Sequence, residues 1–184
     1  RQPQPRRAAV RVEACRGRWA EGFDQLRELA DGPDAPRGLD AELRGRLDES
    51  ERLAMRFLDG RRALFDRRMA EGWVRDGHGD LQAEDVFLLD DGPRVLDCIE
   101  FGEDYRWGDV LADVAFLAMD LERHGREDLA HRFLRWYREL IGDGWPETLA
   151  HHYIAYRAHV RAKVGILRAA QRDVTRQLSD YLAA

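Results

Sequence analysis

The spacing of apolar residues differs in the middle third of this 184-residue chain, and that difference restricts the fold more than any other feature. In the middle third, two short apolar runs at 86–89 and 95–99 are joined by Asp90-Asp91-Gly92-Pro93, a composition typical of a turn. On both sides of these runs, apolar residues recur every three or four positions, as on one face of an α-helix. We therefore predict a mainly α-helical fold with one small β-hairpin.

The helical spacing divides the rest of the chain into separate segments. The first covers residues 16–30 and ends where Asp31-Gly32-Pro33 interrupts the pattern. The second covers residues 40–71, either as one long helix or as two helices that meet near Gly60. Three further apolar helix faces follow the hairpin, at residues 110–121, 133–141 and 149–167.

Length, charge and cysteine content exclude several classes of protein. A chain of 184 residues suits one domain, which we expect at 16–184 after an extended or disordered lead-in at 1–15. No apolar run reaches the ~18–20 residues of a membrane span, and the first residues lack a signal peptide. The formal net charge of −5 argues against a nucleic-acid or membrane partner. Cys15 and Cys98 lack metal-ligand spacing, as is typical of a reduced cytoplasmic protein.

Polar and glycine residues stand directly before the hairpin, in the stretch Arg75-Asp76-Gly77-His78-Gly79-Asp80-Leu81-Gln82-Ala83-Glu84-Asp85. A hairpin would fold Asp80, Asp85 and Glu100 toward one another, and such carboxylates repel unless a cation joins them. Mg²⁺ is the cation that such a cluster would favour. One carboxylate could accept the proton of an attacking hydroxyl while the other two held the Mg²⁺ that neutralises a transferring phosphate.

This stretch resembles the H-x-D-x-x-x-x-N catalytic loop of the protein-kinase-like superfamily, in the H-G-D form of the aminoglycoside phosphotransferase family. Asp97-Cys98-Ile99-Glu100-Phe101-Gly102 looks like that family's metal-binding D-F-G element. The segments at 106–110 and 113–121 are similar to a bacterial subgroup in which a P-loop ATP-binding domain commonly follows. The resemblance implies the helical C-terminal lobe of a kinase-like fold, with the catalytic loop and hairpin at 75–102.

The resemblance also implies a role for each matching residue. Asp80 would be the catalytic base, and Asp85 and Glu100 would hold Mg²⁺, with Asp97 as the alternative to Glu100. His78 would brace the loop, and Asp113 would accept hydrogen bonds that hold the loop in shape. The acceptor would lie against the helical part of the lobe, where acidic side chains suit a cationic amine. The candidate acceptor-binding residues are Glu103, Asp104, Asp120 and Glu122.

Two departures from the family pattern concern charge. Asp85 stands where the family usually has asparagine, which adds a negative charge to an acidic cluster. Upstream of His78 there is neither a glycine-rich phosphate loop nor a lysine, and the single lysine, Lys163, lies far downstream. We therefore interpret the chain as a piece of a larger protein, whose ATP-binding N-terminal lobe lies outside it.

The expected function is ATP-dependent transfer of the γ-phosphoryl group to a hydroxyl of a sugar, aminoglycoside or similar metabolite. A degenerate lobe that serves as a scaffold or regulator is an alternative, and a metal-dependent phosphohydrolase is another. Other residues have simpler interpretations. We expect Cys98 to be an inert core thiol, His151 and His152 to lie at the surface or its boundary, and the pairs Arg61-Arg62 and Arg67-Arg68 to form a solvated helix face.

Overall fold

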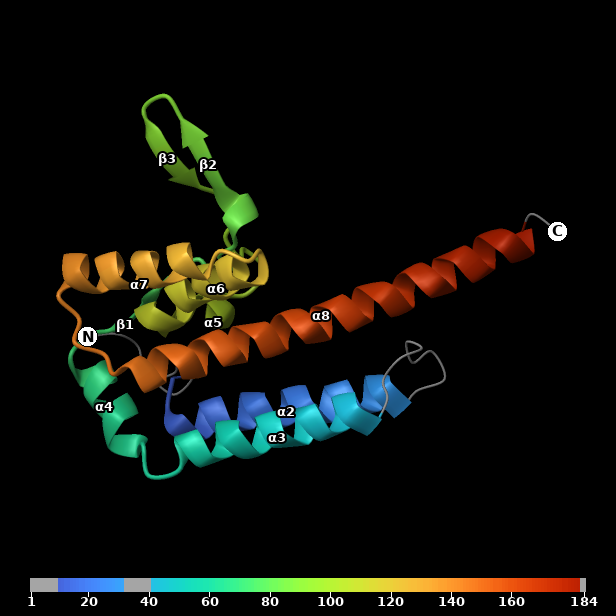
Figure 1. Ribbon diagram of the computed structural model, residues 1–184, viewed down its shortest axis with the longest axis horizontal. Helices are drawn as coiled ribbons and strands as arrows, with labels where there is room; N and C mark the ends of the chain where they lie inside the picture. The colour runs from blue at the N-terminus through green and yellow to red at the C-terminus, as the bar shows by residue number, and fades with distance from the viewer. Residues whose placement is uncertain (1–9, 32–40, 183–184) are drawn as a thin grey trace.

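A layer of helices with one projecting hairpin makes up the computed structural model, which describes residues 10–31 and 41–182 (Figure 1). The side chains of Leu43, Glu103 and residues 169–182 lie outside the description. The mainly helical fold with a small hairpin is confirmed. The elements in chain order are α2 (Val12–Asp31), α3 (Ala41–Leu58), α4 (Arg62–Ala70), β1 (Val74–Asp76), η1 (Ala83–Asp85), β2 (Val86–Leu89), β3 (Gly92–Val95), α5 (Glu103–Arg106), β4 (Trp107–Asp109), α6 (Val110–Arg123), α7 (Glu127–Ile141) and α8 (Glu147–Leu182).

Helices α2 and α3 lie side by side and supply one side of the core (Figure 1). In α2, Trp19, Phe23 and Leu26 recur at helical spacing, and all three are buried. The expected lead-in at 1–15 is wrong for residues 12–15, because α2 begins at Val12 and buries Cys15. Residues 1–9 of that lead-in lie outside the described residues.

The helical segment is interrupted at Gly60, which lies between α3 and α4. Gly60 has φ 71°, a left-handed conformation that a residue with a Cβ rarely adopts. The two-helix alternative for residues 40–71 is therefore the correct one.

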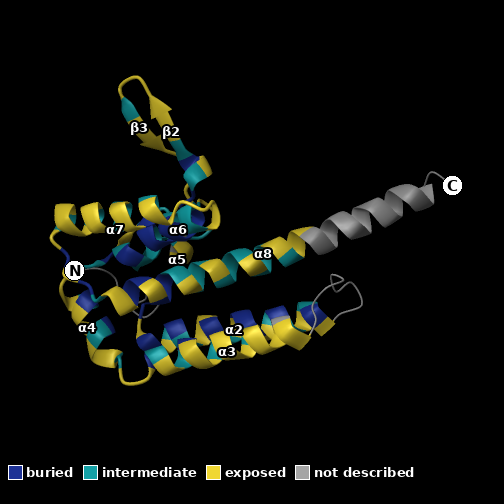
Figure 2. Cartoon of the chain, in the orientation of Figure 1, coloured by how far each residue is buried: buried dark blue, intermediate teal, exposed yellow. Residues whose placement is uncertain are grey.

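Helix α6 lies at the centre of the other half of the molecule and packs against both α7 and α8. Leu111, Ala115 and Ala118 are fully buried on it, as the dark blue of Figure 2 shows for α6. The helix begins after Asp109, whose carboxylate accepts the backbone N–H of Leu111 at 2.9 Å as an N-cap. None of the helices in the described parts of the chain combines the length and hydropathy that a membrane crossing requires.

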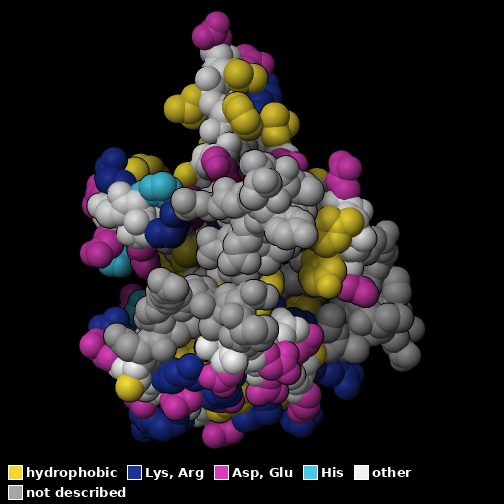
Figure 3. All heavy atoms as spheres, turned by 90° about the vertical axis from the view of Figure 1, so that its right-hand side faces the viewer, with side chains coloured by type: hydrophobic (Ala, Val, Ile, Leu, Met, Phe, Trp, Pro, Cys, Tyr) yellow, Lys and Arg dark blue, Asp and Glu magenta, His cyan; other side chains and the backbone are white. Residues whose placement is uncertain are grey.

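The hairpin β2–β3 projects from the body and leaves its apolar side chains exposed. Its register pairs Val86 with Val95 and Leu89 with Gly92 around a turn at Asp90-Asp91. Leu88 is 84% exposed, and Figure 3 shows apolar side chains along the projection. The hairpin strands therefore form an exposed apolar surface and not part of the core of the described residues.

Strand β3, the second strand of the hairpin, ends at Val95, earlier than the apolar run at 95–99 suggested. The N–H of Leu96 donates to the carbonyl of Asp85, and Asp97 then turns the chain with φ 67°. Cys98 consequently lies outside the sheet and is exposed, so the expectation of a core thiol is wrong. The sequence interpretation also missed the pair of three-residue strands β1 and β4, which is antiparallel.

His152 is buried in the helical core, contrary to the expectation of a boundary residue. It is 7% exposed, its ring stacks on Phe57 at 4.2 Å, and the indole N–H of Trp19 donates to its Nε2 at 3.3 Å. Burial lowers the pKa of His152 to about 4, and the positive charge of Arg61 adds to the effect. The folded protein therefore holds this imidazole neutral.

The first prediction concerns the pH dependence of stability. An unfolded histidine has a pKa of ~6.5, so the unfolded chain binds the extra proton first and stability falls as pH drops from about 6.5 to 4. His152 should contribute a slope of up to ~1.4 kcal/mol per pH unit in that window. Urea unfolding at several pH values should show a smaller slope for His152→Gln, and an unchanged slope for the exposed neighbour variant His151→Gln. Equal slopes in the wild type and His152→Gln would contradict the assignment.

Candidate functional site

The loop at 77–85 is held in place by Asp113, in the first turn of α6. One carboxylate oxygen accepts the backbone N–H of His78 at 2.8 Å, and the other accepts that of Gly79 at 2.8 Å. A Cβ on Gly77 would lie 2.7 Å from Asp113 Oδ2, so glycine there lets the loop approach the carboxylate. Gly79 has φ 87°, which also favours glycine. This is the contact that the family resemblance implied for Asp113.

His78 joins the loop to the segment that follows the hairpin. Its Nε2 lies 2.7 Å from the carbonyl oxygen of Leu96, and because a carbonyl only accepts, Nε2 carries the proton and donates. Its own carbonyl accepts the N–H of Ile99 at 3.1 Å. His78 therefore connects the loop before the hairpin to the segment after it.

Asp80 is half-buried beside two arginines of α8. Partial burial raises the pKa of Asp80, while the charges of Arg161 and Arg157 act in the opposite direction. No hydrogen bond to the Asp80 carboxylate occurs among the residues that the structure describes. An uncommitted carboxylate of this kind can accept a proton from a ligand.

Asp85 and Glu100, the proposed metal ligands, differ in their surroundings. Asp85 is buried, and its Oδ2 accepts the backbone N–H of Gln82 at 2.8 Å in a capping box of η1. Glu100 is exposed. Within the described residues, no group of three or more His, Cys, Asp or Glu side chains could hold a metal. The donor set fits Mg²⁺ only if phosphate oxygens and water complete its coordination, as at many nucleotide sites.

The four candidate acceptor-binding carboxylates do not form one pocket. Asp120 is 2% exposed, and its carboxylate accepts the N–H of Ala83 at 3.1 Å and pairs with Arg123 at 2.9 Å. The expectation that Asp120 binds an acceptor is therefore wrong, because this carboxylate braces η1. Asp104 and Glu122 line two different cavities. The side chain of Glu103 lies outside the described residues.

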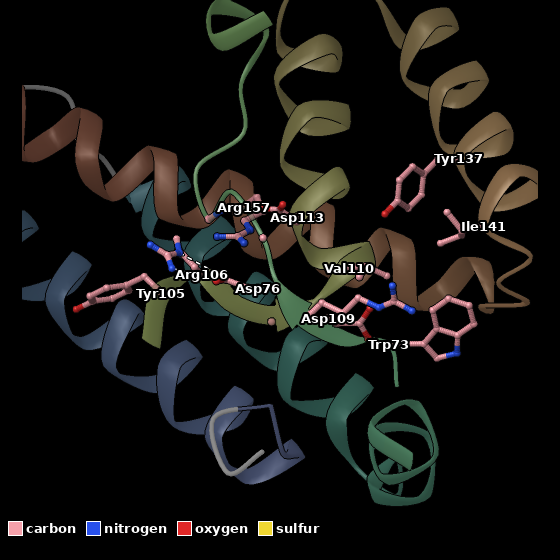
Figure 4. Close-up of a pocket in the computed structure, with 14 residues that line it drawn as sticks. Trp73, Asp76, Tyr105, Arg106, Asp109, Val110, Asp113, Tyr137, Ile141 and Arg157 are labelled. Carbon is pink, nitrogen blue, oxygen red and sulfur yellow. Dashed lines mark hydrogen bonds and ion pairs between the residues drawn. The ribbon is translucent and has the colours of Figure 1, made fainter. Parts of the chain in front are cut away.

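Another cavity lies beside the loop, lined from β1, α5, β4, α6, α7 and α8 (Figure 4). Its volume is about 500 Å³, within the usual range for small-molecule sites. We call it the β1–β4 cavity, and Gly77, Gly79 and Asp113 connect it to the loop. Its other lining residues are Trp73, Arg75, Asp76, Tyr105, Arg106, Gly108, Asp109, Val110, Tyr137, Ile141 and Arg157.

Comparison with known proteins finds mycobacterial relatives whose names state no activity. It is 44% identical over 160 residues to uncharacterized proteins of Mycobacterium bovis and of two strains of Mycobacterium tuberculosis. The match covers 87% of this chain and 30% of each relative. The chain thus spans under a third of these relatives. No protein-family model and no solved structure matches it.

Sequence reasoning missed the buried arginine behind the cavity. Arg68 is 4% exposed, and its guanidinium bridges two buried carboxylates, Asp109 and Asp143. Its Nη2 donates to Asp109 Oδ1 at 2.8 Å and to Asp143 Oδ2 at 2.7 Å. The expectation of a solvated face is wrong for Arg68, which lies one helical turn after the buried Phe65. The three-residue spacing between Phe65 and Arg68 could have indicated from the sequence that Arg68 is buried.

Proposed function

We propose that residues 10–182 form the catalytic lobe of a small-molecule kinase, in which Asp80 accepts the proton of the acceptor hydroxyl. The acceptor oxygen forms a bond to the γ-phosphorus of ATP, the bond to ADP breaks, and the hydroxyl proton passes to Asp80. The observation that carries the proposal is the pair of 2.8 Å hydrogen bonds from the loop backbone to Asp113. They fix the backbone directly before Asp80 while its carboxylate stays uncommitted.

Mg²⁺ would neutralise charge on the transferring phosphoryl group, and Asp85 and Glu100 are the residues that would hold it. The protein's own side chains hold the catalytic loop in position. Asp113 fixes the loop, Asp120 fixes η1 through the N–H of Ala83, and His78 ties the loop to Leu96. Preorganisation of this kind accounts for much of the catalysis in phosphoryl transfer.

We further propose that a segment outside residues 1–184 completes the nucleotide site. Two observations support this proposal. The hairpin exposes Phe87, Leu88 and Leu89, and the relatives are about three times as long as the matched part. The partners are then ATP, an acceptor of small size and the covering segment of the same polypeptide. We place the protein in the cytoplasm, as its cysteine content indicated.

The capping box at Asp85 favours one alternative, a lobe that has lost catalysis and acts as a scaffold or regulator. One oxygen of this carboxylate is committed to the N–H of Gln82, which weakens it as a metal ligand. Turnover of ATP by the longer polypeptide separates the two proposals, because a scaffold would show none. The phosphohydrolase alternative has no comparable support, since the loop offers a single histidine.

Calorimetry with Mg·ATP tests the need for a covering segment. We expect no measurable heat of binding with residues 1–184 and saturable binding with the longer polypeptide, because phosphates need donors on both sides. Far-UV circular dichroism on the same sample should show the helical content of the folded chain. Tight ATP binding by folded residues 1–184 would contradict the two-lobe proposal.

A further inference from the structure

The acceptor carboxylates expected from the sequence do not converge, so the charge of the β1–β4 cavity decides which ligand fits. Three carboxylates line it, and donors within the protein already engage each of them. Asp76 accepts both Nε and Nη2 of Arg106, at 2.8 and 3.0 Å. Asp109 pairs with Arg68, and Asp113 accepts the two loop N–H groups. None of these carboxylates is free to attract a cationic ligand.

Arg157 is one of the cations that line the cavity. Its Nε donates to the carbonyl of Ala112 at 3.1 Å, and its guanidinium lies 4.8 Å from the centre of the Phe116 ring. No carboxylate pairs with it within the described part of the chain. Burial lowers the pKa of Arg157, while the negative charges of Asp113 and Asp80 act in the opposite direction.

The neighbours of Arg157 increase the local positive charge. Arg161 lies one helical turn further along α8, on the same face, and its charge acts on Asp80 together with that of Arg157. Arg75 lines the cavity from β1, with its Nε on the carbonyl of Gly72 at 3.1 Å and no ion pair in the described ranges. An anion in the cavity could accept charge-assisted hydrogen bonds from Arg157 and Arg75, which both line it.

Aromatic side chains complete the wall. Trp73 and Tyr137 line the cavity, and Figure 4 shows the Tyr137 hydroxyl pointing toward the side where Asp113 and Arg157 lie. Indole and phenol rings pack against the apolar faces of sugar rings, and a phenol hydroxyl donates to or accepts from ring hydroxyls. The volume of about 500 Å³ holds a ligand of hexose size.

We propose that the acceptor is a polyhydroxylated molecule with an anionic group, a phosphate or a carboxylate, held by Arg157 and Arg75 in the β1–β4 cavity. This inference rests on the proposed function for the identity of the ligand as the acceptor, whereas the anion site rests on the cavity alone. It replaces the cationic amine that the family resemblance implied.

The test is a set of calorimetric titrations of the chain with D-glucose 6-phosphate, D-glucuronate, D-glucose and kanamycin. We expect at least one of the two anionic probes to bind with Kd of about 1 mM or tighter, and glucose and kanamycin to bind at least about tenfold more weakly. The two anionic probes distinguish a phosphate from a carboxylate. Equal binding of glucose, a preference for kanamycin, or no binding of either anion at about 10 mM overturns the proposal.

Substitutions of Arg157 and Arg75 test whether these residues bind the anionic group. Arg157→Gln should raise the Kd of the anionic probe roughly 10- to 100-fold, the usual effect of losing a charge-assisted hydrogen bond. Arg75→Gln should also weaken binding of the anionic probe. Because Arg75 is exposed, this variant should stay folded, so it tests the site even if Arg157→Gln does not fold. The exposed Arg168→Gln on α8 is the matched control and should leave binding unchanged. Unchanged binding in Arg75→Gln together with unchanged binding in folded Arg157→Gln overturns the assignment.

Two further arms separate this inference from the proposed function. Mg·ATP should not displace the anionic sugar, and competitive displacement that depends on Arg157 would show a nucleotide site and overturn the acceptor assignment. Asp80→Asn should still bind the anionic probe, because the base is not a binding group. Binding that depends on Arg157, without phosphorylated product from the longer polypeptide, would refute the kinase proposal and leave the anion site standing.

Discussion

Asp80→Asn in the longer polypeptide should lower phosphoryl transfer by roughly 10²–10⁴-fold, the range typical of removing a general base. Asparagine keeps the size of the side chain but cannot accept the hydroxyl proton. Asp80 is half-buried and makes no hydrogen bond among the described residues, so the fold should survive the change. The measurement is the steady-state rate of ATP-dependent transfer at saturating acceptor.

The control for Asp80 is Asp90→Asn, the same change at an exposed turn residue of the hairpin. This variant should keep the wild-type rate. The wild-type rate should also fall on the acid side at a higher pH than an ordinary carboxylate would give, because burial raises the pKa of Asp80 and the base must be ionised. Near wild-type turnover by Asp80→Asn would refute its role as the base.

Arg68→Ala should lower the free energy of unfolding by about 3–5 kcal/mol, the largest effect on stability that we expect in this chain. Arg68 bridges Asp109 and Asp143, and all three side chains are nearly inaccessible. Alanine leaves two buried carboxylates without their counter-charge, although Asp109 keeps the N–H of Leu111 and the hydroxyl of Tyr153. The bridge joins α4, the start of α6 and the α7–α8 connection, so its loss acts on the whole helical layer.

Urea unfolding followed by circular dichroism measures this effect. Arg67→Ala is the matched control, because Arg67 is exposed on the same turn of α4. It should change the free energy of unfolding by no more than about 0.5 kcal/mol. A loss below about 1 kcal/mol in Arg68→Ala would show that the bridge contributes little net stability.

The sequence predicted helices better than it predicted surfaces. The spacing of Trp19, Phe23 and Leu26 placed α2 because a buried helix face needs apolar residues every three or four positions. The apolar runs of the hairpin predicted its strands, but they did not show that Leu88 and Leu89 are exposed. A local pattern predicts a strand but does not show which surface covers it.

The loop residues were accessible to prediction because they form an ordered motif. Asp113 follows His78 and Asp80 at a spacing that the family resemblance could use, and its polar side chain interrupts an apolar helix face. Arg68 and Arg157 were missed for a physical reason. A guanidinium is buried only when distant parts of the chain supply its partners, and those partners are 41 and 75 residues away for Arg68.

The most direct test of the kinase proposal is ³¹P NMR of the longer polypeptide with Mg·ATP and the anionic sugar that binds best to residues 1–184. We expect a new phosphate-ester resonance that grows as ATP is converted to ADP and that is absent with Asp80→Asn. Release of inorganic phosphate alone would indicate a phosphohydrolase. Unchanged ATP in the presence of a bound acceptor would contradict the central claim and favour the scaffold.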